Sequence, residues 1–295
     1  MSVRKLLKTL ILQRWNIGFT ETPLEDILAG KPIRYRWMQH HYAGRWFADP
    51  FLLDVTEDAY IVLAEDFDDA RGYAVISKLV VDKQTLELKE VKQLLDRGTH
   101  LSFPVIKRME NDIFVYPENS ESGELNIYRY DRDAERLVKC ETLMVAPLTD
   151  AVMIDYEGES LLFATTLPNP NGDKLDMYVK HNGEYELKDT IVVQGRTARM
   201  GGDFFWHNGN LYRPAQDNNE CYGGALILQK VVVEDEKWTF SDVRRLTSPH
   251  PQYTTGLHTF NSYKGTTVVD IHGYRKHAWL SHLLTKTINL FRTRR

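Results

Sequence analysis

The stretch Phe47-Ala48-Asp49-Pro50-Phe51-Leu52 decides the fold, because the chain repeats its pattern about every fifty residues. It opens with small and polar residues and runs on into a short apolar strand. Four further copies begin at Leu101, Thr149, Gly201 and Gly256. Each copy continues through a turn into a second apolar strand that ends in polar residues. Strands repeated at a fixed period of this size indicate a β-propeller, and five copies predict five blades.

The last repeat is shorter than the others. The first four repeats each hold four strand-like runs, whereas the fifth holds only residues 258–263 and 267–272. A short last blade usually borrows a strand from the other terminus, because an unpaired edge invites aggregation. The alternating run 33–38 is the predicted closing strand. We therefore expect an all-β protein whose five-bladed β-propeller spans residues 31–274.

The two ends of the chain carry a different pattern, in which apolar residues recur at spacings of three and four among basic residues. Residues 1–30 are predicted to form a basic amphipathic helix with a linker, and residues 275–295 a second such helix. These helices either pack on the flank of the propeller, lie on an anionic membrane surface, or bind a partner enzyme. The apolar positions are Val3, Leu6, Leu7, Leu10, Ile11 and Trp15, then Trp279, Leu280, Leu283, Leu284, Ile288 and Phe291.

The net charge of −4 conceals an asymmetry. Residues 1–14 carry +4 and residues 275–295 carry +6, both without an acidic residue, so residues 15–274 sum to −14. Nucleic-acid-binding proteins instead line a working face with basic residues. The charge pattern therefore predicts no nucleic-acid partner.

Cysteine content and the amino terminus indicate the compartment. The two cysteines, Cys140 and Cys221, are too few for a disulfide framework and favour a reducing environment. The basic start lacks the long apolar region and the cleavage site of a secretion signal. No stretch approaches the ~20 apolar residues of a membrane span. We expect a cytoplasmic protein, peripheral to the inner face of a membrane if its ends bind lipid.

Candidate functional residues stand where the inner strands of a propeller begin, because these positions collect at one mouth of the central channel. Carboxylates and amides gathered there suit the hydroxyl groups of a sugar, and nearby aromatic residues suit the faces of its ring. The alternative is that single carboxylates only cap turns between strands. The first strands offer Asp49, Ser102, Asp150, Asp203 and His258, and the second strands end in Glu65, Glu118, Thr165, Gln216, Asp217 and Asp270.

Two arginines suggest an anionic ligand. Arg213 offers a planar fork for a phosphate or carboxylate group, and with Arg199 it would suit a nucleotide-sugar or lipid-diphosphate donor. The sequence shows no Walker loop, Rossmann glycine pattern or zinc spacing. The predicted substrate-binding residues are His100, Ser102, Asp203, Arg213, Gln216, Asp217 and His258.

Three blade starts resemble those of glycoside hydrolase family 43, whose members are five-bladed propellers acting on arabinose-, xylose- or fructose-containing glycans. They are Ala48-Asp49-Pro50, Asp150 before an apolar strand, and Gly256-Leu257-His258. The resemblance implies that Asp49 is a general base, that Asp150 orients and tunes the acid, and that His258 lies on the axis near a divalent metal.

This chain departs from the family at the general acid, a Glu that opens the fourth blade in a Glu-Gly-Pro setting. Met200-Gly201-Gly202-Asp203 stands there instead. Inverting hydrolysis needs a second carboxylic acid ~6.5–9.5 Å from the base, so Asp203 or Glu118 would have to replace that Glu.

A closer resemblance is carried by Trp46-Phe47-Ala48-Asp49-Pro50-Phe51, Leu211-Tyr212-Arg213-Pro214-Ala215-Gln216-Asp217 and Gly256-Leu257-His258-Thr259. These motifs are similar to the amino-terminal propeller of plant glucosamine inositolphosphorylceramide transferases. They are also similar to bacterial propellers found with sugar formyltransferases and surface-polysaccharide enzymes. The resemblance implies a role in glycan or glycolipid assembly.

Three functions follow as alternatives. The first is glycosyl transfer in surface polysaccharide or glycolipid synthesis, with Asp49, Asp150 and Glu118 as catalytic residues. The second is a family-43-like glycosidase. The third is a non-catalytic glycan-binding module that serves a partner enzyme.

Overall fold

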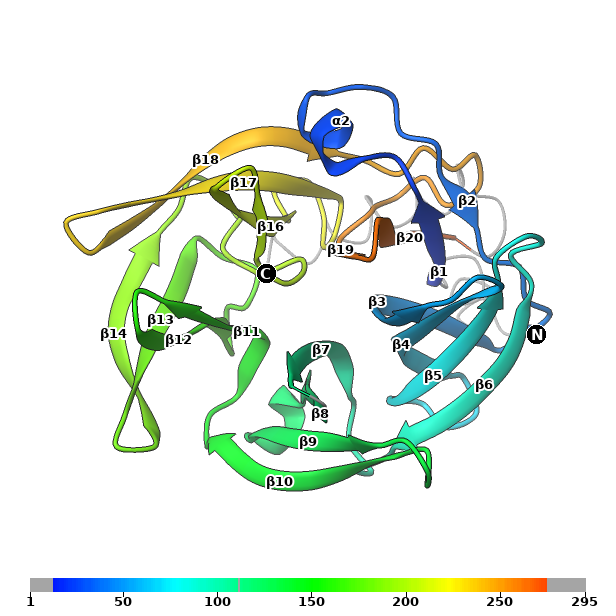
Figure 1. The fold of residues 1–295 in the computed structure, drawn as a ribbon, viewed down its shortest axis with the longest axis horizontal. Coiled ribbons are helices and arrows are strands. Elements are labelled where there is room, and N and C mark those ends of the chain that lie inside the picture. Colours follow the sequence, from blue (N-terminus) through cyan, green and yellow to red (C-terminus); the bar gives the residue numbers. More distant parts are fainter. Residues whose placement is uncertain (1–12, 111, 275–295) are drawn as a thin grey trace, which may run out of the picture.

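Five antiparallel sheets of four strands each surround a central axis (Figure 1). The protein is described here from a computed structural model that covers residues 13–110 and 112–274. Each sheet is one blade, and four blades consist of four consecutive strands. The predicted all-β, five-bladed propeller is therefore confirmed.

The strands of the first four blades follow the predicted repeats closely. Blade 1 contains β3 (Arg45–Val55), β4 (Ala59–Asp68), β5 (Ala74–Asp82) and β6 (Leu88–Leu95). Blade 2 contains β7 (Ser102–Met109), β8 (Asp112–Glu118), β9 (Leu125–Asp131) and β10 (Arg136–Met144). Blade 3 contains β11 (Leu148–Tyr156), β12 (Glu159–Thr166), β13 (Lys174–His181) and β14 (Glu184–Val192). Blade 4 contains β15 (Phe205–His207), β16 (Asn210–Asp217), β17 (Ala225–Glu234) and β18 (Lys237–Leu246).

Blade 5 joins the two ends of the chain. Its strand order is β19 (Phe260–Tyr263), β20 (Thr266–Tyr274), β1 (Gln13–Thr20) and β2 (Arg36–Trp37). The predicted closing run 33–38 therefore supplies only the short outermost strand. The third strand is β1, which pairs with β20 along its whole length.

The assignment of residues 13–20 to a helix and linker was wrong, because this segment alternates like a strand. Trp15, Ile17 and Phe19 are buried at every second position and pack between blades. The propeller thus begins well before residue 31. A short helix, α2 (Leu24–Leu28), follows β1 and buries Ile27. The predicted helical pattern of residues 1–12 and 275–295 lies outside the described residues.

Apolar side chains between neighbouring blades form the core. One cluster runs from blade 1 to blade 4, and Phe51 meets Phe103 within it at a centroid distance of 5.1 Å. A second cluster joins β1 and β20 to blade 1, and a third joins blades 4 and 5 under α2. The packing is therefore continuous around the ring.

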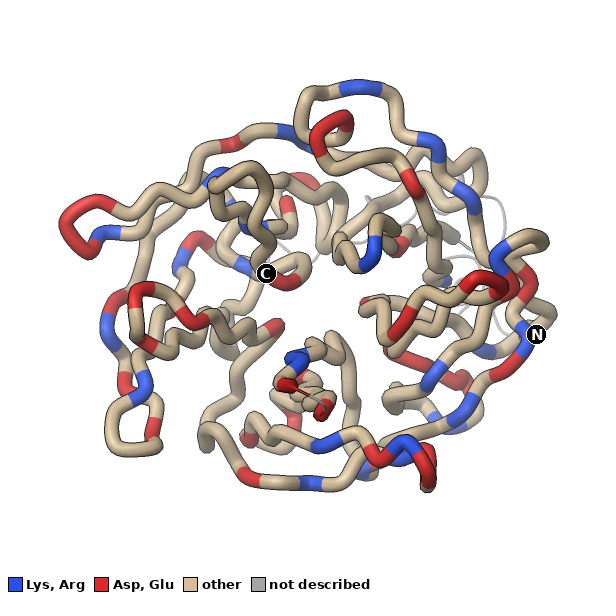
Figure 2. Tube along the Cα trace, in the orientation of Figure 1, with Lys and Arg blue, Asp and Glu red and all other residues tan. Residues whose placement is uncertain are grey.

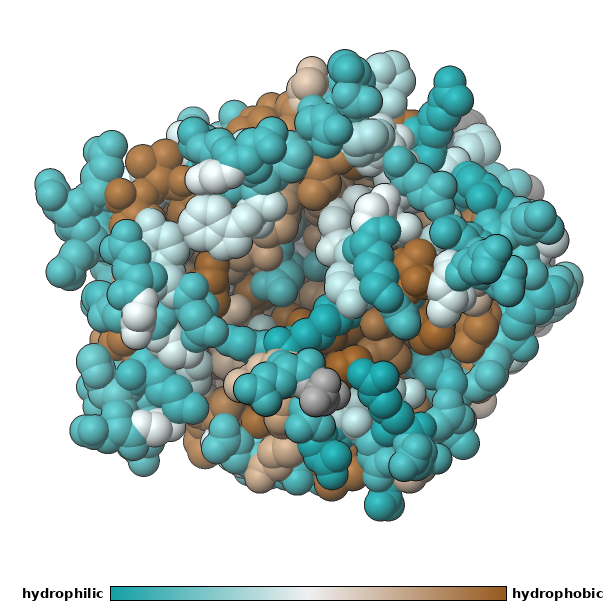
Figure 3. All heavy atoms as spheres, viewed as in Figure 1, coloured by the Kyte–Doolittle hydropathy of each residue, from teal (hydrophilic) through white to brown (hydrophobic). Residues whose placement is uncertain are grey.

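The faces and outer strands carry charges of both signs (Figure 2). The face seen in Figure 3 is hollowed near its centre, where the inner strands approach the axis. In residues 13–110 and 112–274 we find no helix long and apolar enough to cross a membrane.

Closure by β1 predicts a large effect of a small change in this strand. Ile17→Ala removes a fully buried side chain and should lower the free energy of unfolding by about 2–5 kcal/mol. Leu187→Ala on β14 is the control, because Leu187 is 58% exposed and the change should cost about 0.5 kcal/mol or less. Urea unfolding measures both variants. Similar small losses in both would contradict closure by β1.

Candidate active site at the propeller axis

A carboxylate from one blade accepts a backbone N–H of the next blade at three places around the axis. Asp270 Oδ2 accepts the N–H of Asp49 at 3.0 Å, and Asp49 Oδ2 accepts the N–H of Phe103 at 3.2 Å. Glu118 Oε2 accepts the N–H of Asp150 at 3.0 Å. Several predicted site residues therefore also connect neighbouring blades.

The three N–H donors share one backbone conformation. Asp49, Phe103 and Asp150 have φ values of 47°, 45° and 44°, and each lies where the pairing of the first two strands slips. Non-glycine residues seldom adopt this left-handed conformation, which costs on the order of 1–3 kcal/mol. The bulge lets the N–H reach the carboxylate of the neighbouring blade, and this bond stabilises it.

We define the axial cluster as the polar residues that meet near these bulges. Seven of them are predicted candidates at strand starts and strand ends, and the eighth, Arg199, comes from the loop before β15. Its members are Asp49, Glu65, Glu118, Asp150, Arg199, Gln216, His258 and Asp270.

Arg199 forms the centre of one half of the cluster. Its Nε donates to Asp150 Oδ2 at 2.6 Å, and one terminal nitrogen donates to Glu118 Oε2 at 3.1 Å. Its other terminal nitrogen donates to Asn171 Oδ1 at 3.1 Å. Gln216 adds a bond from Nε2 to Asp150 Oδ2 at 2.5 Å. Blades 2, 3 and 4 thus converge on one buried cation.

Strand register explains why Arg199 reaches the axis. Arg199 O accepts the N–H of Gln216 at 2.9 Å, because the segment before β15 continues the pairing of blade 4 with β16. Ala48 pairs with Glu65, and Ser102 with Glu118, at the matching places of blades 1 and 2. Blade 4 therefore presents a guanidinium where the first two blades present small side chains.

His258 forms the centre of the other half. Its Nδ1 lies 2.7 Å from Asp270 Oδ2, and its Nε2 lies 3.5 Å from Asp49 Oδ1. Trp15 of β1 stacks on its ring at 4.1 Å, and the ring of Tyr222 meets its face at 5.5 Å. Asp270 fixes the orientation of the imidazole, and the two aromatic rings limit its movement.

Tyr222 connects the two halves at the edge of the cluster. The Arg199 guanidinium lies 5.4 Å from the centroid of its ring, a cation–π contact. Tyr222 is 41% exposed, whereas the carboxylates beneath it are almost fully buried. Gly223 permits this close approach, because a Cβ on it would lie 3.1 Å from the His258 side chain.

Burial changes the proton affinity of the carboxylates. It raises the pKa of Glu118 to about 8, with Asp150 reinforcing the rise and Arg199 opposing it. Burial and the carboxylates of Glu65, Asp150 and Asp270 raise the pKa of Asp49 well above its ordinary value. Burial opposes ionisation of Asp270 too, but His258 and backbone N–H donors lower its pKa. The cluster therefore holds protonated and ionised acids side by side.

His100 and Ser102 lie at the border of the axial cluster. His100 Nε2 is 3.1 Å from Glu65 Oε1, and this bond raises the pKa of His100 although burial opposes it. Ser102 is buried and pairs with Glu118 through the backbone. Both predicted substrate-binding residues are therefore close to the cluster, on blades 1 and 2.

Arg213 and Asp217 lie outside the axial cluster, which corrects the prediction that both contact substrate. Arg213 is fully buried, donates to the carbonyl oxygens of Thr197 and Ala198, and packs against Phe240. It supports the loop that carries Arg199. Asp217 accepts bonds from Asn219 and Arg245 and so caps the turn after β16.

Asp203 lies outside the hydrogen-bond network of the axial cluster. It lines a cavity of about 70 Å³ with Leu52, Ile106 and Arg108. Its N–H donates to Asn261 Oδ1 at 2.9 Å, and Asn261 Nδ2 donates to Pro50 O at 2.9 Å, next to the bulge at Asp49.

Sequence reasoning missed several members of the site. Trp15 falls within the predicted helix and linker of residues 1–30, and Tyr222 is not among the predicted substrate-binding residues. Arg199 was considered only as a phosphate ligand, whereas the structure pairs it with Asp150 and Glu118. The repeat could have indicated Arg199, because this residue aligns with Ala48 and Ser102 at the start of a blade.

Three residues fit a divalent cation. Asp49, His258 and Asp270 offer ligand atoms that lie within 4.8 Å of one another. Asp49 Oδ1 is buried and has no hydrogen-bond partner among the described residues. Asp270 orients His258 in the way that carboxylates orient metal-binding histidines. Asp49 and His258 would therefore be the direct ligands.

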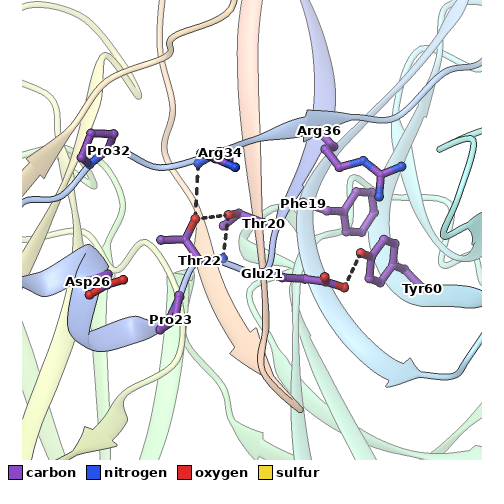
Figure 4. A pocket seen from close by; sticks show the side chains of 10 residues that line it. All are labelled: Phe19, Thr20, Glu21, Thr22, Pro23, Asp26, Pro32, Arg34, Arg36 and Tyr60. Atoms are coloured by element: carbon purple, nitrogen blue, oxygen red, sulfur yellow. Dashed lines mark hydrogen bonds between the residues drawn. The ribbon is translucent and has the colours of Figure 1, made fainter.

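A separate surface pocket of about 430 Å³ lies between β1, the loop after α2 and β4 (Figure 4). Thr22 Oγ1 accepts bonds from Thr20 Oγ1 and from the N–H of Arg34, and Tyr60 donates to Glu21. This pocket lies on the outer side of the propeller and contains none of the residues of the axial cluster.

The fold and the axial cluster define a five-bladed propeller with a polar site on its axis. The family model described as "Glucosamine inositolphosphorylceramide transferase 1, N-terminal" matches residues 36–282, and the chain belongs to this family.

Two plant relatives bear the name glucosamine inositolphosphorylceramide transferase 1. The one from Arabidopsis thaliana is 29% identical over 258 residues, which cover 74% of this chain and 32% of the relative. The one from Oryza sativa subsp. japonica is 27% identical over 200 residues, which cover 64% of this chain and 27% of the relative. The chain thus spans about a third or less of these relatives.

Two solved structures with a similar fold are glycoside hydrolases. A thermostable family-43 glycoside hydrolase superposes with a TM-score of 0.56 at 12% identity, covering 82% of this chain and 89% of the other. A family 117 glycoside hydrolase from Zobellia galactanivorans superposes with a TM-score of 0.54 at 10% identity. The match covers 89% of this chain and 90% of the other. At this level of identity the likeness concerns the fold alone.

The separate place of Asp203 predicts a pH effect on stability. Burial raises the pKa of Asp203 to about 7, so the folded protein keeps a proton that the unfolded chain has lost. Stability should therefore fall as pH rises from about 4 to about 7. Asp203→Asn cannot ionise, and its Tm relative to wild type should increase between pH 5 and pH 8. A Tm difference that is independent of pH would contradict this assignment.

Proposed function

We propose that the axial cluster binds a saccharide and that the protein takes part in glycosyl transfer during the synthesis of a surface glycan or glycolipid. The observation that carries the proposal is the convergence of Asp49, Glu118 and Asp150 with Arg199 and His258 on one site. Relatives that bear the name glucosamine inositolphosphorylceramide transferase 1 support transfer chemistry on a glycolipid.

Two carboxyl groups have distinct roles in this proposal. Glu118, whose pKa burial raises to about 8, holds a proton more readily than an ordinary glutamate and can donate it to a leaving or bridging oxygen. Asp49 has a carboxylate oxygen without a hydrogen-bond partner, which can accept a bond from an attacking hydroxyl group. Asp150 is fully engaged by Arg199 and Gln216, so it positions the acid.

The negative charge of the axial cluster restricts the charge of the ligand that it can bind. Five carboxylates face one arginine in the axial cluster, and Arg213 lies outside it. A neutral or cationic saccharide is therefore favoured over a bare diphosphate at this position. A nucleotide-sugar donor remains a prediction, and its diphosphate would require a compensating cation.

A divalent cation is part of the proposal. Asp49 and His258 would hold it, and when bound it would balance the carboxylates and polarise a sugar or phosphate oxygen. Positive charge beside Asp49 would also lower the pKa of this residue and restore its ability to accept a proton. Asp270 keeps His258 oriented in either state.

The alternative of a non-catalytic glycan-binding module rests on one specific observation. Arg199 engages both Asp150 and Glu118 and occupies a blade-start position in blade 4. A site in which the acids are held this firmly can recognise a sugar without turning it over. A partner enzyme would then carry the chemistry. Location in the cytoplasm remains a proposal in both cases.

The first test separates transfer from binding. Asp49→Asn keeps an oxygen for the Phe103 N–H, and Glu118→Gln keeps one for the Asp150 N–H, so both variants should fold. Each should lower turnover by about 10²–10⁴-fold. The turnover of each variant is measured by mass spectrometry of the products formed from a panel of nucleotide sugars and lipid acceptors.

The control is Asp203→Asn, which changes a carboxyl outside the hydrogen-bond network of the axial cluster and should leave turnover unchanged. Release of reducing sugar from furanosides or xylosides would instead favour the hydrolase. Saturable sugar binding without any product would favour the binding module. No sugar binding at all, with every variant folded, would contradict the proposal.

The cation proposal predicts saturable binding of Ca²⁺, Mg²⁺ or Mn²⁺ by calorimetry. Asp49→Asn and His258→Gln should weaken the affinity at least about tenfold, because each removes a direct ligand. Asp203→Asn should bind as wild type does. Undiminished cation binding in Asp49→Asn would contradict the assigned ligands.

A further inference from the structure

A cleft of about 750 Å³ lies between blades 3 and 4. Residues 191–195, at the end of β14 and in the loop after it, line one side, and β17 and β18 line the other. β14 and β18 are the outermost strands of these two blades (Figure 1). None of the residues that define the axial cluster lines this cleft. It is therefore a separate place on the propeller, and the proposed function does not use it.

Gln229 of β17 is the most deeply buried polar side chain that the argument needs. The residue is 4% exposed and lines the cleft, and its Nε2 donates to Asp242 Oδ1 at 2.8 Å. An ionised carboxylate can only accept hydrogen bonds, so this bond fixes which end of the amide faces Asp242. The other end, Oε1, is buried and has no hydrogen-bond partner among residues 13–110 and 112–274. A buried acceptor of this kind costs free energy unless a group donates to it.

Arg213 lies beside Gln229 on the same face of blade 4. The two residues pair directly across β16 and β17, and Gln229 pairs with Asp242 across β17 and β18. Directly paired residues of antiparallel strands place their side chains on one face of the sheet. Arg213 donates through one terminal nitrogen to two backbone carbonyls, whereas its buried Nε and Nη1 have no acceptor in the described part of the chain. Unused donors and an unused acceptor therefore lie on neighbouring strands.

A hydroxyl group suits this arrangement, because it can donate one hydrogen bond and accept two. It would donate to Gln229 Oε1 and could accept from Arg213. An ionised phosphate or carboxylate accepts only, so it would leave Oε1 without a donor and would face the carboxylate of Asp242. Asp242 is the one charged residue among those that line the cleft, all of which are described. The chemistry therefore favours a neutral ligand that carries hydroxyl groups.

Aromatic side chains give the cleft a surface for the apolar face of a sugar ring. Trp238 and Phe240 of β18 line the cleft and lie on the same face of the strand as Asp242. The guanidinium of Arg213 lies 4.4 Å from the centroid of the Phe240 ring, so its unused donors adjoin this aromatic surface. Apolar rings with a few convergent polar groups are the usual lining of a site for a small ligand.

We propose that this cleft is a second saccharide-binding site, in which a neutral sugar donates a hydroxyl group to Gln229 Oε1 and packs on Trp238 and Phe240. The inference does not rest on the proposed function, because no residue of the axial cluster takes part in it. The cleft offers a single carboxylate, that of Asp242, whereas glycoside chemistry generally uses a pair. The site therefore holds a glycan without converting it.

Fluorine NMR of the full chain labelled with 5-fluorotryptophan tests this site, because two tryptophans report on two different places. Trp238 lines the cleft, and Trp15 stacks on His258 in the axial cluster. Replacing each tryptophan with Phe assigns its signal. Titration with methyl glycosides of neutral hexoses and pentoses, and with their trisaccharides, should shift the Trp238 signal saturably. Asp49→Asn should leave this shift unchanged.

Gln229→Met removes the unused acceptor and keeps the length of the side chain. The affinity reported by Trp238 should fall at least about tenfold, as expected when a hydrogen bond to a buried group is lost. The Tm should change by about 3 °C or less, because the one bond lost within the protein is to the exposed Asp242. Gln93→Met is the matched control, since Gln93 is exposed on β6, the outermost strand of blade 1, and should bind saccharide as wild type does.

Several results would overturn the proposal. They are no shift of the Trp238 signal with any saccharide, an unchanged affinity in Gln229→Met, a tighter response to inorganic phosphate than to the saccharides, and a lost response in Asp49→Asn. A large fall in Tm for Gln229→Met, without saccharide binding by wild type, would show that Oε1 holds an ordered water only. A shift of the Trp238 signal without one of Trp15 would support this site and count against the proposed function, so the two failures are distinguishable.

Discussion

The bond from a carboxylate of one blade to a backbone N–H of the next is the interaction on which this propeller depends. Asp270 holds the bulge at Asp49, Asp49 holds the bulge at Phe103, and Glu118 holds the bulge at Asp150. Each bond satisfies a buried N–H in an unfavourable backbone conformation and joins two neighbouring sheets. The acids are thus part of the fold before they contact any ligand.

The same arrangement explains the chemistry available at the axis. Holding so many carboxylates in a buried space favours protonation of some of them, and Glu118 and Asp49 respond in this way. Arg199 compensates part of the negative charge and immobilises Asp150, while His258 is oriented by Asp270 and covered by Trp15. What is left uncompensated is concentrated at Asp49 Oδ1, and this atom is the natural point of contact for a hydroxyl group or a cation.

The sequence predicted the architecture because the repeat reports strand pairs directly, and the blade starts at Asp49, Asp150 and His258 do converge. It did not predict β1, because the helical spacing of the preceding residues seemed to continue through Trp15. Arg213 stood in the most unusual motif of the chain, yet its burial depends on Phe240 in another strand. Asp203 stands two positions after a blade start, and one bulge more or less decides which face of the strand its side chain takes.

Closure of the ring between β1 and β20 has a consequence for biogenesis. Translation produces β1 before any other strand of the propeller and β20 after all of them. Until then, Trp15, Ile17 and Phe19 lack the sheet that covers them, and blade 1 lacks a neighbour on one side. Nascent chains with exposed apolar strands are prone to aggregate. The first strand is therefore the part of the propeller that waits longest during synthesis for its hydrogen-bonding partner.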